Sequence, residues 1–269
     1  MHNLFLTPFE ISKDISSIGE KKASETIFEL FIFGVLAGIY IAFGASVATA
    51  VLSGGTLDAG FAGFLAGSVF SVGLMLVLIL GSELFTGNIL MTIGLIYKKY
   101  SFTKVLRNWL VVYLGNLLGA MIIAWLVFKS GLLGEAASLS PTGAVAVNIA
   151  ESKMQLTFVE ALCRGILCNM LVCLAVIMSI AARTVEGKIL GIYFPIMAFV
   201  ASGYEHSVAN MYFLPAALMA KGEIISGFFS MFSNLIPVTI GNIIGGLLIV
   251  LLHPKIEEKI ARIILRKKR

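Results

Sequence analysis

The sequence has few charged residues for its length. Only 13% of its 269 residues are Asp, Glu, Lys or Arg, whereas 58% are hydrophobic and the mean hydropathy is +0.97. Soluble domains carry about 25% charged residues, so this composition predicts a chain that lies in a membrane. Its net charge of +5 is therefore expected to reflect membrane topology and contact with anionic lipid, and no nucleic-acid partner is predicted.

The residues of a redox, metal or catalytic centre are also scarce. Three cysteines lie five residues apart in one apolar segment, and on a helix they would point in different directions: Cys163, Cys168 and Cys173. They predict small packing residues, without a disulfide or a metal site. The sequence contains no phosphate-binding glycine loop with a lysine and no nucleophile–base motif, so we expect neither an enzyme nor a cofactor. The N-terminus lacks the apolar core of a signal peptide and is expected to remain as a short amphipathic lead-in.

Six long apolar segments are present, and a spanning helix needs about 20 residues. The segments are 27–51, 60–97, 109–128, 154–182, 189–220 and 224–252. Two of them, 60–97 and 189–220, are too long for one crossing, because at about 1.5 Å per residue they would form helices of about 57 and 48 Å. Each contains a polar interruption, GSELFTGN at 81–88 and GYEHSVAN at 203–210. We predict an all-α membrane protein with six transmembrane helices, of which the second and fifth are broken.

Lys and Arg are unequally distributed over the connections between these segments. If both termini lie on one side, sixteen of these residues fall on that side and three on the other: Lys129, Lys153 and Lys221. The positive-inside rule then places both termini in the cytoplasm. The predicted organisation is an N-terminal segment (1–26), a three-helix repeat (27–128), an extracytoplasmic connection (129–153), a second three-helix repeat (154–252) and a basic tail (253–269).

The two three-helix halves share three patterns in the same chain order, at offsets of 122, 126 and 131 residues. These are Gly81, Glu83 and Asn88 with Gly203, Glu205 and Asn210; GNLLGAMII (115–123) with GNIIGGLLI (241–249); and Glu29, Gly34 and Leu36 with Glu160, Gly165 and Leu167. Because each half has three crossings, the second half is inverted relative to the first. Inverted repeats with paired broken helices predict a solute site near the membrane midplane.

His206 is the strongest candidate for a functional residue. An ionisable side chain inside the membrane is costly, and imidazole changes charge near physiological pH. The alternative is a neutral histidine bonded to a neighbouring helix. Glu83 and Glu205 are expected to be structural, accepting hydrogen bonds from freed backbone N–H groups or from the opposite half's asparagine. Asn88 and Asn210 are expected to begin the second half-helices, with the amide oxygen accepting from free N–H groups.

The glycines fall into two groups. Gly34/Gly38, Gly63/Gly67, Gly115/Gly119 and Gly241/Gly245 have the spacing of small residues at close helix contacts. Gly81 and Gly203 instead flank polar residues in the long segments. We expect unwound backbone there, which is tolerated at membrane depth only against protein or a water-filled cavity.

Other polar residues fit a pore. Thr86 offers a hydroxyl beside Leu84 and Phe85. This combination suits a constriction that removes water from the solute but forms one hydrogen bond with it. Lys153 lies at the mouth of the fourth span, where it either attracts anions or anchors the chain at the interface.

Two other charged segments are assigned structural roles. Glu160 and Arg164 are four residues apart on one helix and are expected to pair. The tail PKIEEKIARIILRKKR is expected to form an amphipathic helix on the inner leaflet.

The stretches GYEHSVANM, SELFTGN and ESKMQLTFVEALCRGILCNMLVCLAV together resemble the formate/nitrite transporter family, over essentially the whole chain. The resemblance implies an aquaporin-like fold and a homopentamer with one pore per protomer. It also implies passage of small monovalent anions or the corresponding weak acids: formate, nitrite, hydrosulfide and, in some members, acetate or lactate.

The resemblance also implies roles for individual residues. His206 would be the central pore histidine, and Thr86 would belong to the mobile loop of the broken second helix. Lys153 would be the vestibule lysine, and Asn169 would contact the central region. The implied apolar lining has an inner constriction, an outer constriction and one further position: Leu74, Leu84 and Phe85; Phe70 and Phe199; and Val172. Tyr204 stands where many members have phenylalanine.

The expected function is a channel or transporter for small weak-acid anions, with formate first, in the cytoplasmic membrane. An anion drawn in by Lys153 is expected to gain a proton near His206, or to be stabilised there by imidazolium. The expected partners are these anions, protons, membrane lipids and further copies of the chain. Open alternatives are nitrite or hydrosulfide as the main solute, a neutral-solute pore, a membrane protein without conduction, and ion-coupled transport. A neutral-solute pore would ordinarily carry Asn-Pro-Ala at the half-helix starts, and that motif is absent.

Overall fold

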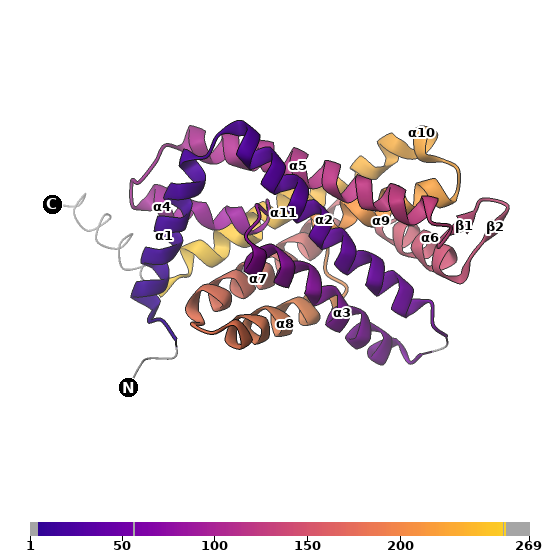
Figure 1. Ribbon diagram of the computed structural model, residues 1–269, viewed down its shortest axis with the longest axis horizontal. Helices are drawn as coiled ribbons and strands as arrows, with labels where there is room; N and C mark the ends of the chain where they lie inside the picture. The colour runs from indigo at the N-terminus through magenta and orange to yellow at the C-terminus, as the bar shows by residue number, and fades with distance from the viewer. Residues whose placement is uncertain (1–4, 56, 255, 257–269) are drawn as a thin grey trace.

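The computed structural model describes residues 5–55, 57–254 and 256, and almost all of its elements are helices (Figure 1). Helix α1 (Pro8–Ser24) precedes the first half, which contains α2 (Ile27–Leu52), α3 (Ala59–Leu80), the 3-10 helix η1 (Gly87–Met91), α4 (Thr92–Ile96) and α5 (Phe102–Lys129). A connection follows, with β1 (Gly134–Glu135), β2 (Ser138–Leu139) and α6 (Pro141–Met154). The second half contains α7 (Phe158–Ala181), α8 (Val185–Ala201), α9 (Ser207–Ala220), α10 (Ile224–Gly227), the 3-10 helix η2 (Phe228–Met231) and α11 (Phe232–Leu251).

Five helical segments in the described part of the chain are long and apolar enough to cross a membrane. They are Ile27–Leu52, Ala59–Leu80, Phe102–Lys129, Phe158–Ala181 and Ile224–Leu251. The fifth of the six crossings is shared by α8 and α9, which are shorter. The predicted all-α fold of six crossings in two inverted halves is confirmed, and the protein is a multi-pass membrane protein.

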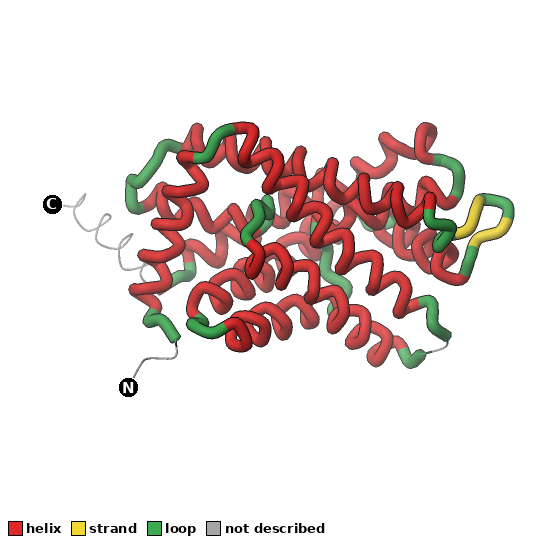
Figure 2. Tube along the Cα trace, viewed as in Figure 1, coloured by secondary structure: helices red, strands yellow, loops and turns green. Residues whose placement is uncertain are grey.

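Both predicted breaks are present, and Figure 2 shows their non-helical segments among the helices, away from the ends of the bundle. Gly81 ends α3 with φ +81°, and Gly203 follows α8 with φ +69°. Such left-handed conformations are accessible to glycine because it has no Cβ. The helices that precede the breaks differ in length: α3 has 22 residues, whereas α8 has 17.

The first helix of each half begins with the same capping box. Thr26 and Glu29 cap α2, and Thr157 and Glu160 cap α7, each through reciprocal side chain–backbone hydrogen bonds. This arrangement corrects the expected pairing of Glu160 with Arg164. The Oε2 atom of Glu160 accepts from the backbone N (2.8 Å) and the Oγ1 (2.7 Å) of Thr157, and no ion pair joins Glu160 to Arg164.

The segments outside the two halves lie at opposite ends of the molecule. Helix α1 packs against η1 and α4 at one end, and α6 lies with the β1–β2 hairpin at the other (Figure 1). The sequence analysis did not predict a helix in the connection, although Ser140 caps α6 through the backbone N of Gly143 and Pro141 is its first residue. Most of the predicted amphipathic tail (253–269) lies outside the described residues, at 255 and 257–269.

Glycine contacts hold the helices of each half together, as the spacing predicts. In the first half α2 packs on α5, and a Cβ on Gly34 would lie 3.3 Å from the Cα of Gly115. In the second half α7 packs on α11, and a Cβ on Gly241 would lie 3.0 Å from the Cα of Gly165. Larger residues at these positions would force the backbones apart. The three cysteines are free, and two of them, Cys168 and Cys173, are buried.

Gly63 and Gly67 form a matched pair for testing this packing, because both lie on α3 and face α8. A Cβ on Gly67 would lie 2.5 Å from the carbonyl oxygen of Met197, whereas a Cβ on Gly63 would lie 3.4 Å from that of Ala201. We expect Gly67→Ala to lower the free energy of unfolding by about 1–3 kcal/mol through overpacking, and Gly63→Ala to change it little. Thermal unfolding in detergent measures both. Equal unfolding temperatures for the two variants would contradict this account of the α3–α8 contact.

Candidate functional site

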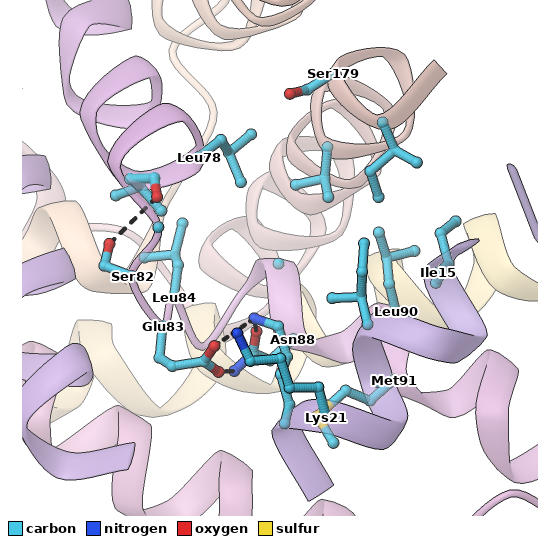
Figure 3. A pocket seen from close by; sticks show the side chains of 18 of the residues that line it. Ile15, Lys21, Leu78, Ser82, Glu83, Leu84, Asn88, Leu90, Met91 and Ser179 are labelled. Atoms are coloured by element: carbon cyan, nitrogen blue, oxygen red, sulfur yellow. Dashed lines mark hydrogen bonds and ion pairs between the residues drawn. The ribbon is translucent and has the colours of Figure 1, made fainter. Parts of the chain in front are cut away.

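Two cavities approach the middle of the bundle from opposite ends. The α1 vestibule, of about 360 Å³, lies between α1 and the first break, and Glu83, Leu84 and Asn88 are part of its lining (Figure 3). The α6 vestibule, of about 400 Å³, lies between α6 and the second break and includes Glu205 and His206. The two breaks therefore place polar groups at the inner ends of two openings.

Asparagines from the third crossing of each half compensate the unwound backbone. Asn116 on α5 accepts from the backbone N of Phe85 (3.0 Å) and donates to the carbonyl oxygens of Gly34 and Glu83 (2.8 and 2.9 Å). Asn242 on α11 forms the corresponding three bonds, accepting from Ser207 and donating to the carbonyls of Gly165 and Glu205. Buried backbone groups left unpaired would be costly, so these two asparagines make the breaks possible.

Glu83 is the centre of a buried polar cluster at the α1 vestibule. Its Oε1 lies 2.7 Å from the Nζ of Lys22, and its Oε2 accepts from the amide nitrogens of Asn88 (2.6 Å) and Asn108 (3.4 Å). Figure 3 shows Glu83 and Asn88 facing one another below Leu84. The lysine also donates to the Oδ1 of Asn88 (2.7 Å). The carboxylate is thus compensated by a cation and two amides.

Glu205 forms an equivalent cluster at the α6 vestibule. Its Oε1 accepts from the Nζ of Lys153 (2.8 Å), and its Oε2 accepts from the amide nitrogens of Asn210 (2.6 Å) and Asn234 (3.4 Å). The Nζ of Lys153 also lies 5.3 Å from the ring centroid of Phe213, a cation–π distance. Each half therefore carries one buried carboxylate with one lysine and two asparagines.

The clusters correct two expectations about the breaks. The glutamates accept from side chains of their own half, not from freed backbone N–H groups or from the opposite half's asparagine. Asn88 and Asn210 donate to these carboxylates through their amide nitrogens and do not cap the second half-helices. The cap of α9 is His206, whose Nδ1 accepts from the backbone N of Ala209 (3.1 Å).

His206 connects the two breaks. Its Nε2 lies 2.8 Å from the Oγ1 of Thr86, and both residues are almost entirely buried, at 3% and 0% exposure. Because Nδ1 accepts a backbone hydrogen bond, the proton of a neutral ring is on Nε2, and Nε2 donates to the threonine hydroxyl. An imidazolium would carry a proton on Nδ1 and would lose the α9 cap. The geometry therefore favours a neutral histidine.

Asn169 on α7 holds the threonine backbone from the other side. Its amide nitrogen donates to the carbonyl oxygens of Thr86 (3.2 Å) and Asn242 (2.6 Å). Its Oδ1 is buried and has no partner among the described residues. One acceptor next to the Thr86–His206 pair is thus available to a solute or to water.

Apolar side chains lie on both sides of the Thr86–His206 pair. On the α6 side, the rings of Phe70 and Phe199 meet edge to face with centroids 5.6 Å apart, and Phe199 lies 5.9 Å from the imidazole. On the α1 side, Leu84 lines the vestibule. The other residues of the predicted lining are also buried: Leu74, Phe85 and Val172. The ring of Phe85 packs against α5, 5.0 Å from Tyr113 and 6.4 Å from Trp109.

Sequence reasoning missed the lysine of the first half and the four asparagines of the third crossings, although each has a signal at the repeat offsets. Lys22, Thr26 and Glu29 recur 131 residues later as Lys153, Thr157 and Glu160. The asparagines recur 126 residues apart: Asn108 with Asn234, and Asn116 with Asn242. Asn116 and Asn242 lie within the quoted motifs, and extending the repeat comparison outward would have found Lys22, Asn108 and Asn234.

One carboxyl in the α1 vestibule lies outside the cluster. The pKa of Glu25, between α1 and α2, is raised by burial and next by the Glu83 carboxylate. It loses its charge more readily than an exposed glutamate as the pH falls. The described residues contain no group of three or more histidines, cysteines or carboxylates that could hold a metal ion.

Comparison with known proteins agrees with this geometry. The family model described as formate/nitrite transporter matches residues 9–255. A probable formate transporter of Methanothermobacter thermautotrophicus is 41% identical over 93% of this chain and 96% of its own length. The formate channel FocA of Escherichia coli K12 is 34% identical over 91% of this chain and 92% of its own length.

Solved structures give the same result. A pentameric formate channel with formate bound superposes with a TM-score of 0.73 at 34% identity, over 83% of this chain and 94% of that one. An ion channel of the FNT family superposes with a TM-score of 0.78 at 29% identity, over 89% of this chain and 95% of that one. The chain therefore belongs to the formate/nitrite transporter family, whose members are membrane channels and transporters and not enzymes.

Proposed function

We propose that this protein conducts small monovalent weak-acid anions, with formate as the main solute, and that passage past His206 depends on pH. The observation that carries the proposal is the Thr86–His206 hydrogen bond (2.8 Å) inside an apolar barrier, with a lysine–glutamate pair at each approach. Such a barrier excludes ions by the cost of removing them from water, while the two lysines, each with N–H donors beyond its bonds to the cluster, offer hydrogen bonds to an anion at its ends.

A full negative charge is costly between the Phe70–Phe199 rings and Leu84, so we propose that the solute crosses this part as the neutral acid. The anion takes a proton from water in one vestibule, crosses, and returns the proton to water in the other vestibule. One proton therefore moves with each anion. Neutral His206 keeps its cap on α9 and orients the Thr86 hydroxyl for a hydrogen bond to the passing acid.

The choice of formate rests on the relatives, several of which are named formate transporters or channels. Nitrite and hydrosulfide are the alternatives within the same mechanism. We further propose a homopentamer in the cytoplasmic membrane, with both termini in the cytoplasm. The pentameric relative and the excess of Lys and Arg on the side of the termini support this arrangement.

Flux measurements in proteoliposomes test the proposal. Formate, nitrite, hydrosulfide and chloride are compared between about pH 5 and 8, with glycerol as a neutral control. We expect selective flux of the weak acids that rises as the pH falls, because the neutral fraction of each solute rises. Glycerol flux without any response to anions would instead identify a neutral-solute pore.

His206→Asn tests the role of the histidine. Asparagine is a good N-cap, so we expect α9 to stay capped while the bond to Thr86 is lost. Formate flux should fall at least ~10-fold, which corresponds to about 1.4 kcal/mol in the barrier, while its rise with falling pH should persist, because the neutral fraction of the solute sets that rise. Wild-type flux would remove the histidine from the mechanism, and loss of the pH dependence would contradict a histidine that stays neutral.

Lys153 and Glu205 allow the structural and conducting roles of the α6-side cluster to be separated. Lys153→Gln leaves a buried carboxylate (4% exposed side chain) without its cation, so we expect the free energy of unfolding to fall by up to about 3–5 kcal/mol. The double variant Lys153→Gln/Glu205→Gln should recover most of the stability but not the formate flux.

Thermal unfolding and proteoliposome flux are measured on the same preparations of both variants. Recovery of both quantities in the double variant would show that the lysine serves only to compensate Glu205. Lys22→Gln and its double with Glu83→Gln provide the matched pair in the other half.

A further inference from the structure

Arg164 is a charged residue of the α6 vestibule that the proposed mechanism does not use. It lies on α7, has an exposed side chain, and lines the vestibule together with Lys153 and Glu205. Its carbonyl oxygen accepts from the backbone N of Glu205 (3.3 Å), which fixes α7 against the second break. This backbone hydrogen bond therefore holds Arg164 next to Glu205 in the α6 vestibule.

The equivalent position in the first half has no charge. At the offset of 131 residues Arg164 corresponds to Phe33, which lines the α1 vestibule. The carbonyl of Phe33 accepts from the backbone N of Glu83 (3.2 Å) in the same way. The scaffold thus needs only the backbone at this position, and the guanidinium is a feature of the α6 vestibule alone.

Arg164 is also the charged residue of this vestibule lining that forms no ion pair within 4.0 Å among the described residues. The formally charged residues among the described lining are Lys153, Arg164 and Glu205, and the first and last of these form an ion pair. Glu160, one turn before Arg164, has its Oε2 occupied by Thr157 and interacts with the guanidinium only beyond ion-pair distance. No carboxylate of the described residues lies within 4.0 Å of the guanidinium as an ion pair. The net positive charge of this vestibule therefore comes from Arg164.

We propose that Arg164 is a recognition residue, which binds a planar two-oxygen anion in the α6 vestibule before the anion reaches His206. This inference rests on the proposed conduction of formate. A guanidinium presents parallel N–H donors that match the two oxygens of a carboxylate, whereas an ammonium offers a point charge. Since Phe33 replaces it in the α1 vestibule, the two ends of the path differ in their affinity for the anion.

The test is the concentration of formate that gives half-maximal flux, measured for entry from each end. Intact cells without formate transport of their own receive the protein, and inverted vesicles from the same cells present its other face. In one of the two preparations we expect Arg164→Gln to raise the half-saturating concentration by about three- to tenfold, with little change in the maximal rate. Arg164→Lys keeps the positive charge but loses the parallel N–H donors of the guanidinium. Its half-saturating concentration should lie between those of Arg164→Gln and the wild type.

Lys21→Gln is the matched control, because it removes one cation from the α1 vestibule. In the preparation that responds to Arg164→Gln, Lys21→Gln should leave the half-saturating formate concentration at its wild-type value. A wild-type half-saturating concentration for Arg164→Gln in both preparations would overturn the inference, as would full function of Arg164→Lys. Absence of formate flux from the wild type in both preparations would overturn the proposed function itself. That outcome differs from failure of the Arg164 inference, in which the wild type conducts formate.

Discussion

Unwinding a helix inside an apolar bundle removes backbone and carboxylate groups from water, and a set of buried asparagines and lysines compensates that cost. Asn116 and Asn242 bind the freed backbone, and Lys22 and Lys153 neutralise the two buried glutamates. Without these partners each break would carry several unpaired groups, each worth about 1–3 kcal/mol. The breaks in turn bring Thr86 and His206 together, so the path through the protein depends on this compensation.

The two halves share one scaffold, and they differ where the solute passes. The lysines, glutamates and asparagines of the two clusters occupy equivalent positions, but His206 corresponds to Leu84 at the offset of 122 residues. The histidine thus enters the path from one half only, and its partner Thr86 comes from the other. Equivalent residues build the supports of the two breaks, whereas unequal residues give the path its chemistry.

The crossings and the breaks were predictable because length, hydropathy and repeat offset are local or periodic properties of the sequence. The partners of single polar atoms were not. Whether Asn210 accepts from its own helix or donates to Glu205 depends on Asn234, 24 residues away, and on how α9 and α11 pack. Likewise the spacing of Glu160 and Arg164 suggested a pair, but Glu160 binds Thr157 through Oε2 and forms no ion pair with Arg164. Short-range rules fail where a tertiary partner competes for the same atom.

The position of each lysine bears on how the chain is inserted during synthesis. Lys22 precedes the first crossing of its half and Lys153 precedes the first crossing of the other, while Asn108 and Asn234 lie on the third. All the groups that compensate Glu83 are therefore made before α6, and all those that compensate Glu205 follow from α6 onward. Each half can complete its own charge compensation as soon as its third crossing is in the bilayer, without waiting for the other half.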